Sequence, residues 1–370
     1  MNKGSFSGLG IVLATVAAAT TLQPWPSVII VAEPIDVTVS AAALATAFSF
    51  LTLAGFLARR YDWLDRPVGV AFTVTGSVGV VGSALTALAV VTDAGASVSL
   101  WPPLAAVFGT ATGLTGVVEW SELRIDEVLD RSEAVVARSI VAVGALLVAG
   151  VLDAVLRPIA TVLFSGNEML ASALASPTAA GLGLTVVAAV YLYWHDDGLE
   201  FVDLDWLDTR ELLYCIGGFI GLLVALIFAA ELLAGLGVPS SRSGVVEQGI
   251  ERSPDIFLAV LPVSMLLVGP AEELLFRNVI QKSLYATFSQ PSAVVLSSVL
   301  YAAIYLPAYA TVSFPAALGG LALAFVLSLV LAYTYAQTDN LLVPTVIHGG
   351  FNAFQYAVLY VAVTREVGVV

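Results

Sequence analysis

Long apolar segments recur along the whole sequence, and they constrain the fold more than any other feature. Each has about twenty residues, the length of helix that crosses the hydrocarbon core of a bilayer. Of the 370 residues, 59% are hydrophobic and only 11% are charged, whereas a soluble domain has about one quarter charged residues. Because backbone polar groups in lipid must bond within their own segment, the sequence predicts an all-α, polytopic transmembrane helix bundle.

About eleven segments are expected to cross the membrane. They are residues 1–22, 37–57, 68–91, 98–118, 140–155, 177–194, 212–236, 256–275, 293–311, 315–336 and 341–363. The first could extend through Val31, or it could be a cleaved signal sequence, because the small residues Ala17–Ala19 lie near its end. We favour the uncleaved helix, since the rest of the chain is anchored in either case.

The basic residues predict the orientation of these segments. With eleven spans, most of them fall on the side of the N-terminus, which the positive-inside rule makes cytoplasmic. That side holds Lys3, Arg59, Arg60, Arg66, Arg124, Arg131, Arg138, Arg210, Arg277 and Lys282, and the other side holds Arg242, Arg252 and Arg365. We therefore expect a multi-pass protein of the cell membrane with a cytoplasmic N-terminus.

Two charged segments interrupt the apolar pattern. Residues 119–138 are too charged to span a membrane and are expected to form a helical connector at its surface. The acidic loop 195–210 is the best internal boundary. It separates N-terminal membrane helices of unrecognised type, residues 1–200, from a C-terminal block, residues 205–363, that holds the unusual polar residues.

The charge balance and the cysteine count exclude several classes of protein. The chain has 28 Asp and Glu against 14 Lys and Arg, and Lys3 and Lys282 are the only lysines. Such a composition is typical of halophilic sources and argues against nucleic acid as a partner. Cys215 is the single cysteine, which excludes an intramolecular disulfide and a multi-cysteine metal site.

The first of three polar clusters in the C-terminal block contains two adjacent carboxylates within an apolar run. Carboxylates at membrane depth are costly unless they are paired or bound, so they indicate a functional site. Glu273 and Arg277 are four residues apart and can pair along a helix. Glu272, about 100° round that helix, then points elsewhere, and Pro270 opens the backbone locally. The alternative is a helix that begins at Pro270, with both glutamates in its first turn.

The second cluster is His348-Gly-Gly-Phe-Asn352. His348 and Asn352 share one helical face, and the two glycines between them allow a neighbouring helix to approach closely. Such a histidine either hydrogen-bonds between helices or serves as a ligand or catalytic group. In the third cluster, Tyr301 and Tyr305 lie one turn apart. By composition alone they would bond between helices or join an aromatic belt.

One further pair, Asp153 and Arg157, lies near the end of a predicted span. The two residues are four positions apart, so an ion pair that stabilises packing is the leading interpretation. The alternative is a proton relay or a transport site. No inverted repeat supports a transporter.

A Glu-Glu-x-x-x-Arg motif followed three spans later by His-x-x-x-Asn resembles the type II CAAX prenyl endopeptidases. This family is also called the CPBP or Abi intramembrane metalloproteases, and the resemblance covers roughly residues 205–363. It implies a five-helix hydrolase core with Glu272 as the general base and with Glu273 and Arg277 as structural support. His348 and Asn352 would stabilise the oxyanion or bind metal. Zinc or another divalent metal could be held by His348 and Glu272.

The resemblance also implies a class of substrate, namely a membrane peptide or a prenylated or otherwise processed protein at the lipid bilayer. The sequence departs from the family's middle motif, Phe-x-x-x-His, where it has Tyr301 and Tyr305. A phenol, with a pKa of about 10, is a poor base and a poor zinc ligand. We do not expect His195, in the acidic loop, to replace the missing histidine, but Tyr305 could donate a hydrogen bond to a substrate carbonyl or orient a water.

The leading hypothesis is an endopeptidase of the CAAX-processing type that cleaves a peptide bond near the cytoplasmic membrane surface. The alternative is a catalytically degraded homologue that serves as a membrane peptide- or protein-binding module. The two hypotheses differ in whether the substituted middle motif still supports catalysis.

Overall fold

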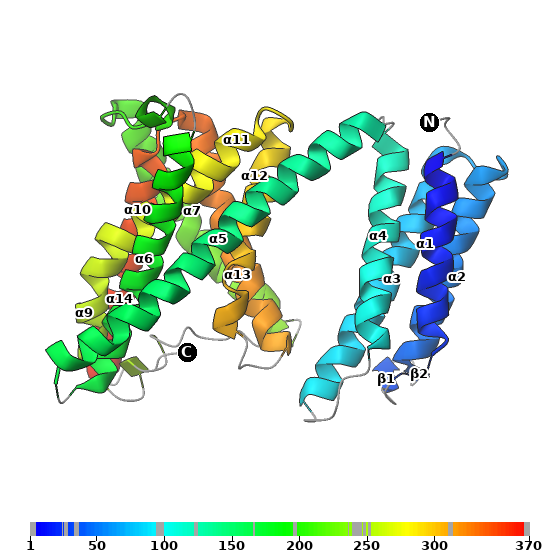
Figure 1. The fold of residues 1–370 in the computed structure, drawn as a ribbon. Coiled ribbons are helices and arrows are strands. Elements are labelled where there is room, and N and C mark those ends of the chain that lie inside the picture. The colour runs from blue at the N-terminus through cyan, green and yellow to red at the C-terminus, as the bar shows by residue number, and fades with distance from the viewer. Residues whose placement is uncertain are drawn as a thin grey trace. The chain divides into compact units, whose positions relative to one another are not determined.

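The computed structural model describes most of the chain and divides it into two compact units, Met1–Asp130 and Arg131–Val370. The described residues are 5–23, 25, 29–32, 37–93, 100–121, 125–165, 167–194, 198–235, 237–238, 246, 249–250, 253–309 and 314–365. Their regular elements are helices apart from one short hairpin of two strands (Figure 1). The prediction of an all-α membrane bundle is confirmed, with that hairpin as a local exception.

The first unit is built from four helices. They are α1 (Ser5–Thr21), α2 (Ala41–Arg60), α3 (Arg66–Asp93) and α4 (Trp101–Ser121). Helix α1 packs against α2 and α4, and α3 also packs against both of them, which closes the bundle. Small side chains of α2, including Ala41, Ala45, Ser49 and Thr52, are buried at these contacts. Small residues let helix backbones come close together, as membrane helices require.

A hairpin precedes the second helix. Strands β1 (Ile29–Ala32) and β2 (Val37–Ser40) pair in antiparallel register, with Ile29 opposite Ser40. The Ser40 side chain then accepts a hydrogen bond from the backbone N–H of Ala43 at 3.1 Å and so caps α2. The predicted span 37–57 is therefore wrong at its start, because its first four residues form β2.

The second unit carries the C-terminal polar clusters. Its longer helices are α5 (Ile125–Leu163, which begins in the first unit), α6 (Glu168–Trp194), α7 (Thr209–Gly235), α12 (Gln290–Ala303), α13 (Phe314–Thr338) and α14 (Leu342–Thr364). Between α7 and α12 lie α9 (Asp255–Val263), η2 (Ser264–Val268), α10 (Gly269–Glu273), η3 (Leu274–Gln281) and α11 (Lys282–Leu284). Two single 3₁₀ turns, η1 (Gly198–Phe201) and η4 (Leu306–Tyr309), complete the unit.

Residues 125–138 of the predicted surface connector are part of the same helix as the predicted fifth span. Helix α5 has 39 residues and is about 58 Å long at 1.5 Å per residue. Its acidic first turn, with Asp126 and Glu127, leads without a break into the apolar part. That part exposes Leu147 and Val151, as a lipid-facing helix does. The polar residues thus extend a spanning helix beyond the hydrocarbon core rather than forming a separate element.

Eight helices among the described residues are long and apolar enough to cross a membrane. They are Ala41–Arg60, Arg66–Leu88, Asp126–Leu163, Glu168–Trp194, Thr209–Gly235, Asp255–Leu284, Ala316–Thr338 and Leu342–Thr364. These helices make the protein a multi-pass membrane protein. The predicted span 293–311 is corrected, because α12 ends at Ala303 and η4 follows. Pro307 lacks an N–H and disfavours helical backbone in the residue before it.

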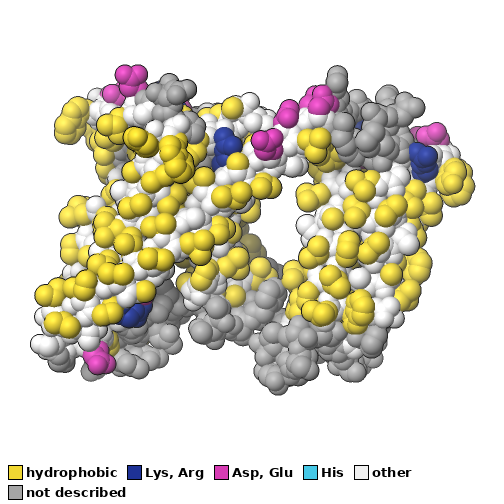
Figure 2. Space-filling model, in the orientation of Figure 1, with side chains coloured by type: hydrophobic (Ala, Val, Ile, Leu, Met, Phe, Trp, Pro, Cys, Tyr) yellow, Lys and Arg dark blue, Asp and Glu magenta, His cyan; other side chains and the backbone are white. Residues whose placement is uncertain are grey.

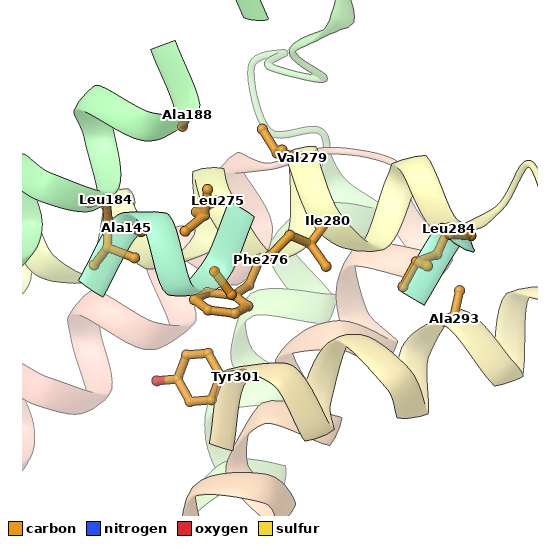
Figure 3. Close-up of a cluster of buried hydrophobic side chains, with 13 residues drawn as sticks. Ala145, Leu184, Ala188, Leu275, Phe276, Val279, Ile280, Leu284, Ala293 and Tyr301 are labelled. Carbon is orange, nitrogen blue, oxygen red and sulfur yellow. The ribbon is translucent and has the colours of Figure 1, made fainter. Parts of the chain in front are cut away.

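The core of the second unit is centred on the helix that holds Glu272. Leu275, Phe276 and Ile280 are fully buried there. They pack with side chains from α5, α6 and α12, among them Leu184 and Tyr301 (Figure 3). Because α5 and α6 belong to this core, the compact unit reaches further toward the N-terminus than the core predicted at residues 205–363.

A second cluster lies where α7, α13 and α14 meet. It contains Leu222, Leu331, Val343 and Ile347, which are nearly or fully inaccessible. On the face shown in Figure 2, hydrophobic side chains cover the helices, and acidic side chains lie near the helix ends. This distribution fits helices that are surrounded by lipid along their length and by water at their ends.

Candidate active site

One continuous helix, Asp255–Leu284, carries the paired carboxylates. Two π-helical stretches, η2 and η3, flank the short α-helical segment α10 that holds Glu272 and Glu273. Such wide turns are uncommon and are often found at functional sites. Pro270 lies inside this helix, with helical residues on both sides. The alternative of a helix that begins at Pro270 is therefore wrong.

A contact between two glycines brings α14 against this helix. A Cβ atom on Gly349 would stand 2.8 Å from the carbonyl oxygen of Met265, too close for any other residue type without movement. A Cβ atom on Gly269 would stand 3.3 Å from the backbone nitrogen of Gly349. The predicted close approach at the His348 motif is thus present, and it places His348 beside the two glutamates.

Glu273 is the centre of a buried ion-pair network. Its Oε2 atom accepts a hydrogen bond from Arg277 Nε at 2.8 Å, and its Oε1 atom lies 2.7 Å from His348 Nδ1. Glu273 and Arg277 are both completely buried, so the predicted i,i+4 ion pair is present. Because the arginine keeps Glu273 ionised, His348 donates from Nδ1, and its Nε2 atom faces Glu272.

Arg277 has further contacts that orient it. Its Nη2 atom donates to Ser328 Oγ at 3.1 Å, and its guanidinium lies 5.2 Å from the centre of the Tyr301 ring. Nη1 is buried and has no hydrogen-bond partner among the described residues. The arginine therefore links α13 and α12 to the glutamates, while one N–H group lacks an acceptor.

Glu272 is held by the two tyrosines of the altered motif. The Tyr301 hydroxyl donates to Oε2 at 2.7 Å, and the Tyr305 hydroxyl donates to Oε1 at 2.9 Å. His348 Nε2 lies 3.6 Å from Oε2, which is beyond direct hydrogen-bonding distance. Glu272 thus lies between His348 and the tyrosine pair, while the hydrogen bond of His348 is with Glu273 rather than with Glu272.

The remaining predicted site residues fall outside this cluster. Asn352 is half-buried on α14 and makes no hydrogen bond with the described side chains of the site. His195 lies outside the described residues. Asp153 pairs with Arg157 at 2.6 Å, and both bond to Ser176. This network joins α5 to α6, as expected of an ion pair that stabilises packing.

A polar network at one end of the site helix was not predicted. Lys282 Nζ and the Tyr335 hydroxyl each bond to the carboxylate of Asp203 at 2.6 Å. Asn278 Oδ1 accepts from the backbone N–H of Asp203 at 2.9 Å. These bonds attach the segment after η1 to η3, α11 and α13. The sequence signal for this network was the pair of polar residues Asn278 and Lys282, which lie one and five residues after Arg277.

An apolar cavity lies on another side of the same helix. Its volume is about 790 Å³, and its lining includes Pro270 and Leu274 from the site helix and Leu342 and Thr345 from α14. The segment after α6 contributes Leu199. Glu272 and His348 are not among the lining residues, so this cavity is separate from the polar cluster.

The donor set does not fit a catalytic zinc ion. Such a site has three protein ligands, and the described residues contain no group of three His, Cys, Asp or Glu side chains that could hold a metal. Glu272 and His348 approach each other, but phenols stand at the remaining positions round Glu272.

Comparison with known protein families gives a match in the C-terminal part of the chain. Residues 254–354 match the family model described as type II CAAX prenyl endopeptidase Rce1-like. The matched region contains both glutamates, Arg277, the tyrosine pair and His348, and it lies within the span 205–363 that carried the resemblance. No curated protein matches the chain. No solved structure matches it either.

Proposed function

We propose that the protein is a membrane-embedded endopeptidase that cleaves a peptide bond near the cytoplasmic membrane surface. Its substrate would be a membrane peptide or a lipid-modified or otherwise processed protein. The family match supports the class of reaction. The observation that carries the proposal is the position of Glu272. Its carboxylate is buried, is held by hydrogen bonds from two tyrosines, and lies 3.6 Å from His348 Nε2.

In this proposal Glu272 is the general base. It takes a proton from a water that attacks the scissile carbonyl carbon, and it later returns that proton to the leaving amine. When protonated on both nitrogens, His348 donates from Nε2 to the oxyanion, and Glu273 balances its charge through Nδ1. Asn352 is proposed as a second donor that approaches once substrate is bound.

The hydrogen bonds of Glu272 favour one alternative. Both of its oxygens already accept from phenols, which weakens them as proton acceptors. A protein in which this arrangement never opens would bind a membrane peptide or protein without cutting it. We propose this binding module as the second candidate function.

A reporter peptide separates the two candidates. The full-length protein is purified in detergent and incubated with a membrane-anchored fluorogenic peptide, in wild type and in Glu272→Gln. The endopeptidase proposal expects turnover that falls by about two to four orders of magnitude in the variant, because the base is lost. Glu231→Gln, an exposed glutamate in α7, is the matched control and should keep wild-type turnover. Peptide binding without turnover in wild type would favour the binding module.

A further inference from the structure

The two tyrosines at Glu272 differ in how firmly they are held. Tyr301 lies inside α12, is 5% exposed, and packs edge-on against Phe276 with ring centres 5.2 Å apart. The guanidinium of Arg277 covers its ring. Tyr305 comes after the end of α12 and is only half-buried. The first tyrosine is therefore fixed by packing on several sides, whereas the second stands at a helix end.

The hydrogen bonds show the same asymmetry. Three contacts join Glu272 and the phenols: 2.7 Å to Tyr301, 2.9 Å to Tyr305, and 3.1 Å between the two hydroxyl oxygens. Each phenol has one hydroxyl proton, so only two of the three contacts can be hydrogen bonds when Glu272 is ionised. The two shorter contacts, from the phenols to the carboxylate, are the hydrogen bonds. The two phenol oxygens then face each other with no proton between them. Moving one phenol away removes this repulsion, and Tyr305 is the less confined.

We propose that Tyr305 is a catalytic residue whose hydroxyl moves from Glu272 Oε1 to the carbonyl oxygen of the bound substrate. Tyr301 stays on Oε2 as a positioning residue. The move has two effects at once: the oxyanion gains a donor, and Oε1 loses the donor that weakened it as a base. Substrate binding thereby activates the base. This inference rests on the proposed endopeptidase function.

The reaction balances with water as the only co-reactant. The water oxygen bonds to the carbonyl carbon, one water proton goes to Glu272 Oε1, and the π electron pair of the carbonyl becomes the oxyanion. Tyr305 keeps its own proton and donates a hydrogen bond to that oxygen. The carbon–nitrogen bond then breaks, and the proton on Glu272 goes to the amine. The products are a carboxylic acid and an amine.

The kinetic test compares Tyr305→Phe with Tyr301→Phe and with Tyr309→Phe. Tyr309 follows four residues after Tyr305 on η4 and has no hydrogen bond to Glu272, so its variant should resemble wild type. Removal of one oxyanion donor lowers kcat by about 10²–10³-fold. We expect a loss of this size in Tyr305→Phe with KM changed less than about threefold. Glu272-dependent turnover that survives intact in Tyr305→Phe would overturn the inference and leave the proposed function standing.

A spectroscopic test does not depend on turnover. A peptide with a ¹³C-labelled scissile carbonyl is bound to full-length Glu272→Gln and to the double variant Glu272→Gln/Tyr305→Phe, and the carbonyl stretch is recorded by infrared difference spectroscopy. A donated hydrogen bond lowers this frequency, so we expect a downshift that is lost only in the double variant. Equal frequencies in the two proteins would refute a bond from Tyr305. Absence of peptide binding by wild type would overturn the inference and the proposed function together.

Discussion

Substitution of Arg277 by methionine tests the electrostatic basis of the site. Methionine is unbranched and apolar, shorter than arginine and without charge, so Arg277→Met leaves Glu273 ionised in a position that is completely buried. Removing one partner of a buried ion pair costs about 3–5 kcal/mol, because the other charge is left without compensation. His348 Nδ1 remains at 2.7 Å and offsets part of this cost. We therefore expect a loss of about 3 kcal/mol in the free energy of unfolding.

A double variant separates charge from packing. Arg277→Met/Glu273→Gln removes both charges, while the glutamine oxygen can still accept from His348. We expect it to be more stable than Arg277→Met, because no charge is left buried without a partner. The coupling energy, which is the effect of the double variant minus the sum of the two single effects, should have a magnitude of about 1–3 kcal/mol, as is usual for residues in one network. A simple sum of the two single effects would mean that the charges do not interact.

The assay is reversible unfolding of the purified protein by SDS in mixed micelles, followed by circular dichroism. Arg210→Met is the control: Arg210 is exposed and bonds to the backbone carbonyl of Gln337, so its loss should cost less than about 1 kcal/mol. An Arg277→Met protein within about 1 kcal/mol of wild type would refute the reasoning. It would show that Glu273 is neutral or hydrated in the folded protein.

Two other substitutions test the packing of the site. Gly349→Ala should destabilise the protein by about 1–3 kcal/mol and reduce turnover, because the new Cβ would stand 2.8 Å from the carbonyl oxygen of Met265. Gly350→Ala, whose Cβ would be 4.0 Å from its nearest neighbour, should behave as wild type in the same unfolding assay. Asp203→Ala removes the acceptor shared by Lys282 and Tyr335; amide hydrogen exchange in residues 198–208 should rise about tenfold, a change of about 1.4 kcal/mol. Asp205→Ala, an exposed neighbour with no side-chain hydrogen bond among the described residues, should leave that exchange unchanged.

The helical architecture and the pairing of Glu273 with Arg277 could be predicted from the sequence. Both depend on short-range regularities: the length of apolar runs and a spacing of four residues. The Gly-Gly pair also indicated where α14 comes close, since small residues at a membrane helix interface have few other roles.

The hydrogen-bond partners of Glu272 could not be predicted from the sequence and are seen only in the three-dimensional structure. No local pattern shows that Tyr301 and Tyr305 reach that carboxylate, because they are about thirty residues away from Glu272 in the sequence and meet it only after the chain turns back. The end of α12 at Ala303 was missed for a related reason. The apolar run continues past Ala303, and Pro307 disfavours helical backbone only in the residue before it.

The wide turns of η2 and η3 make the number of residues in this helix as important as their identity. Each such stretch contains more residues per turn than an ordinary helix, and so sets the direction in which every later side chain points. Deleting one residue between Leu274 and Gln281 would rotate the rest of the helix by about 100°. Lys282 would then turn away from Asp203, to which it now bonds at 2.6 Å. A homologue with one residue fewer between Arg277 and Lys282 would keep the Glu-Glu-x-x-x-Arg motif and still lose the contact that joins this helix to Asp203.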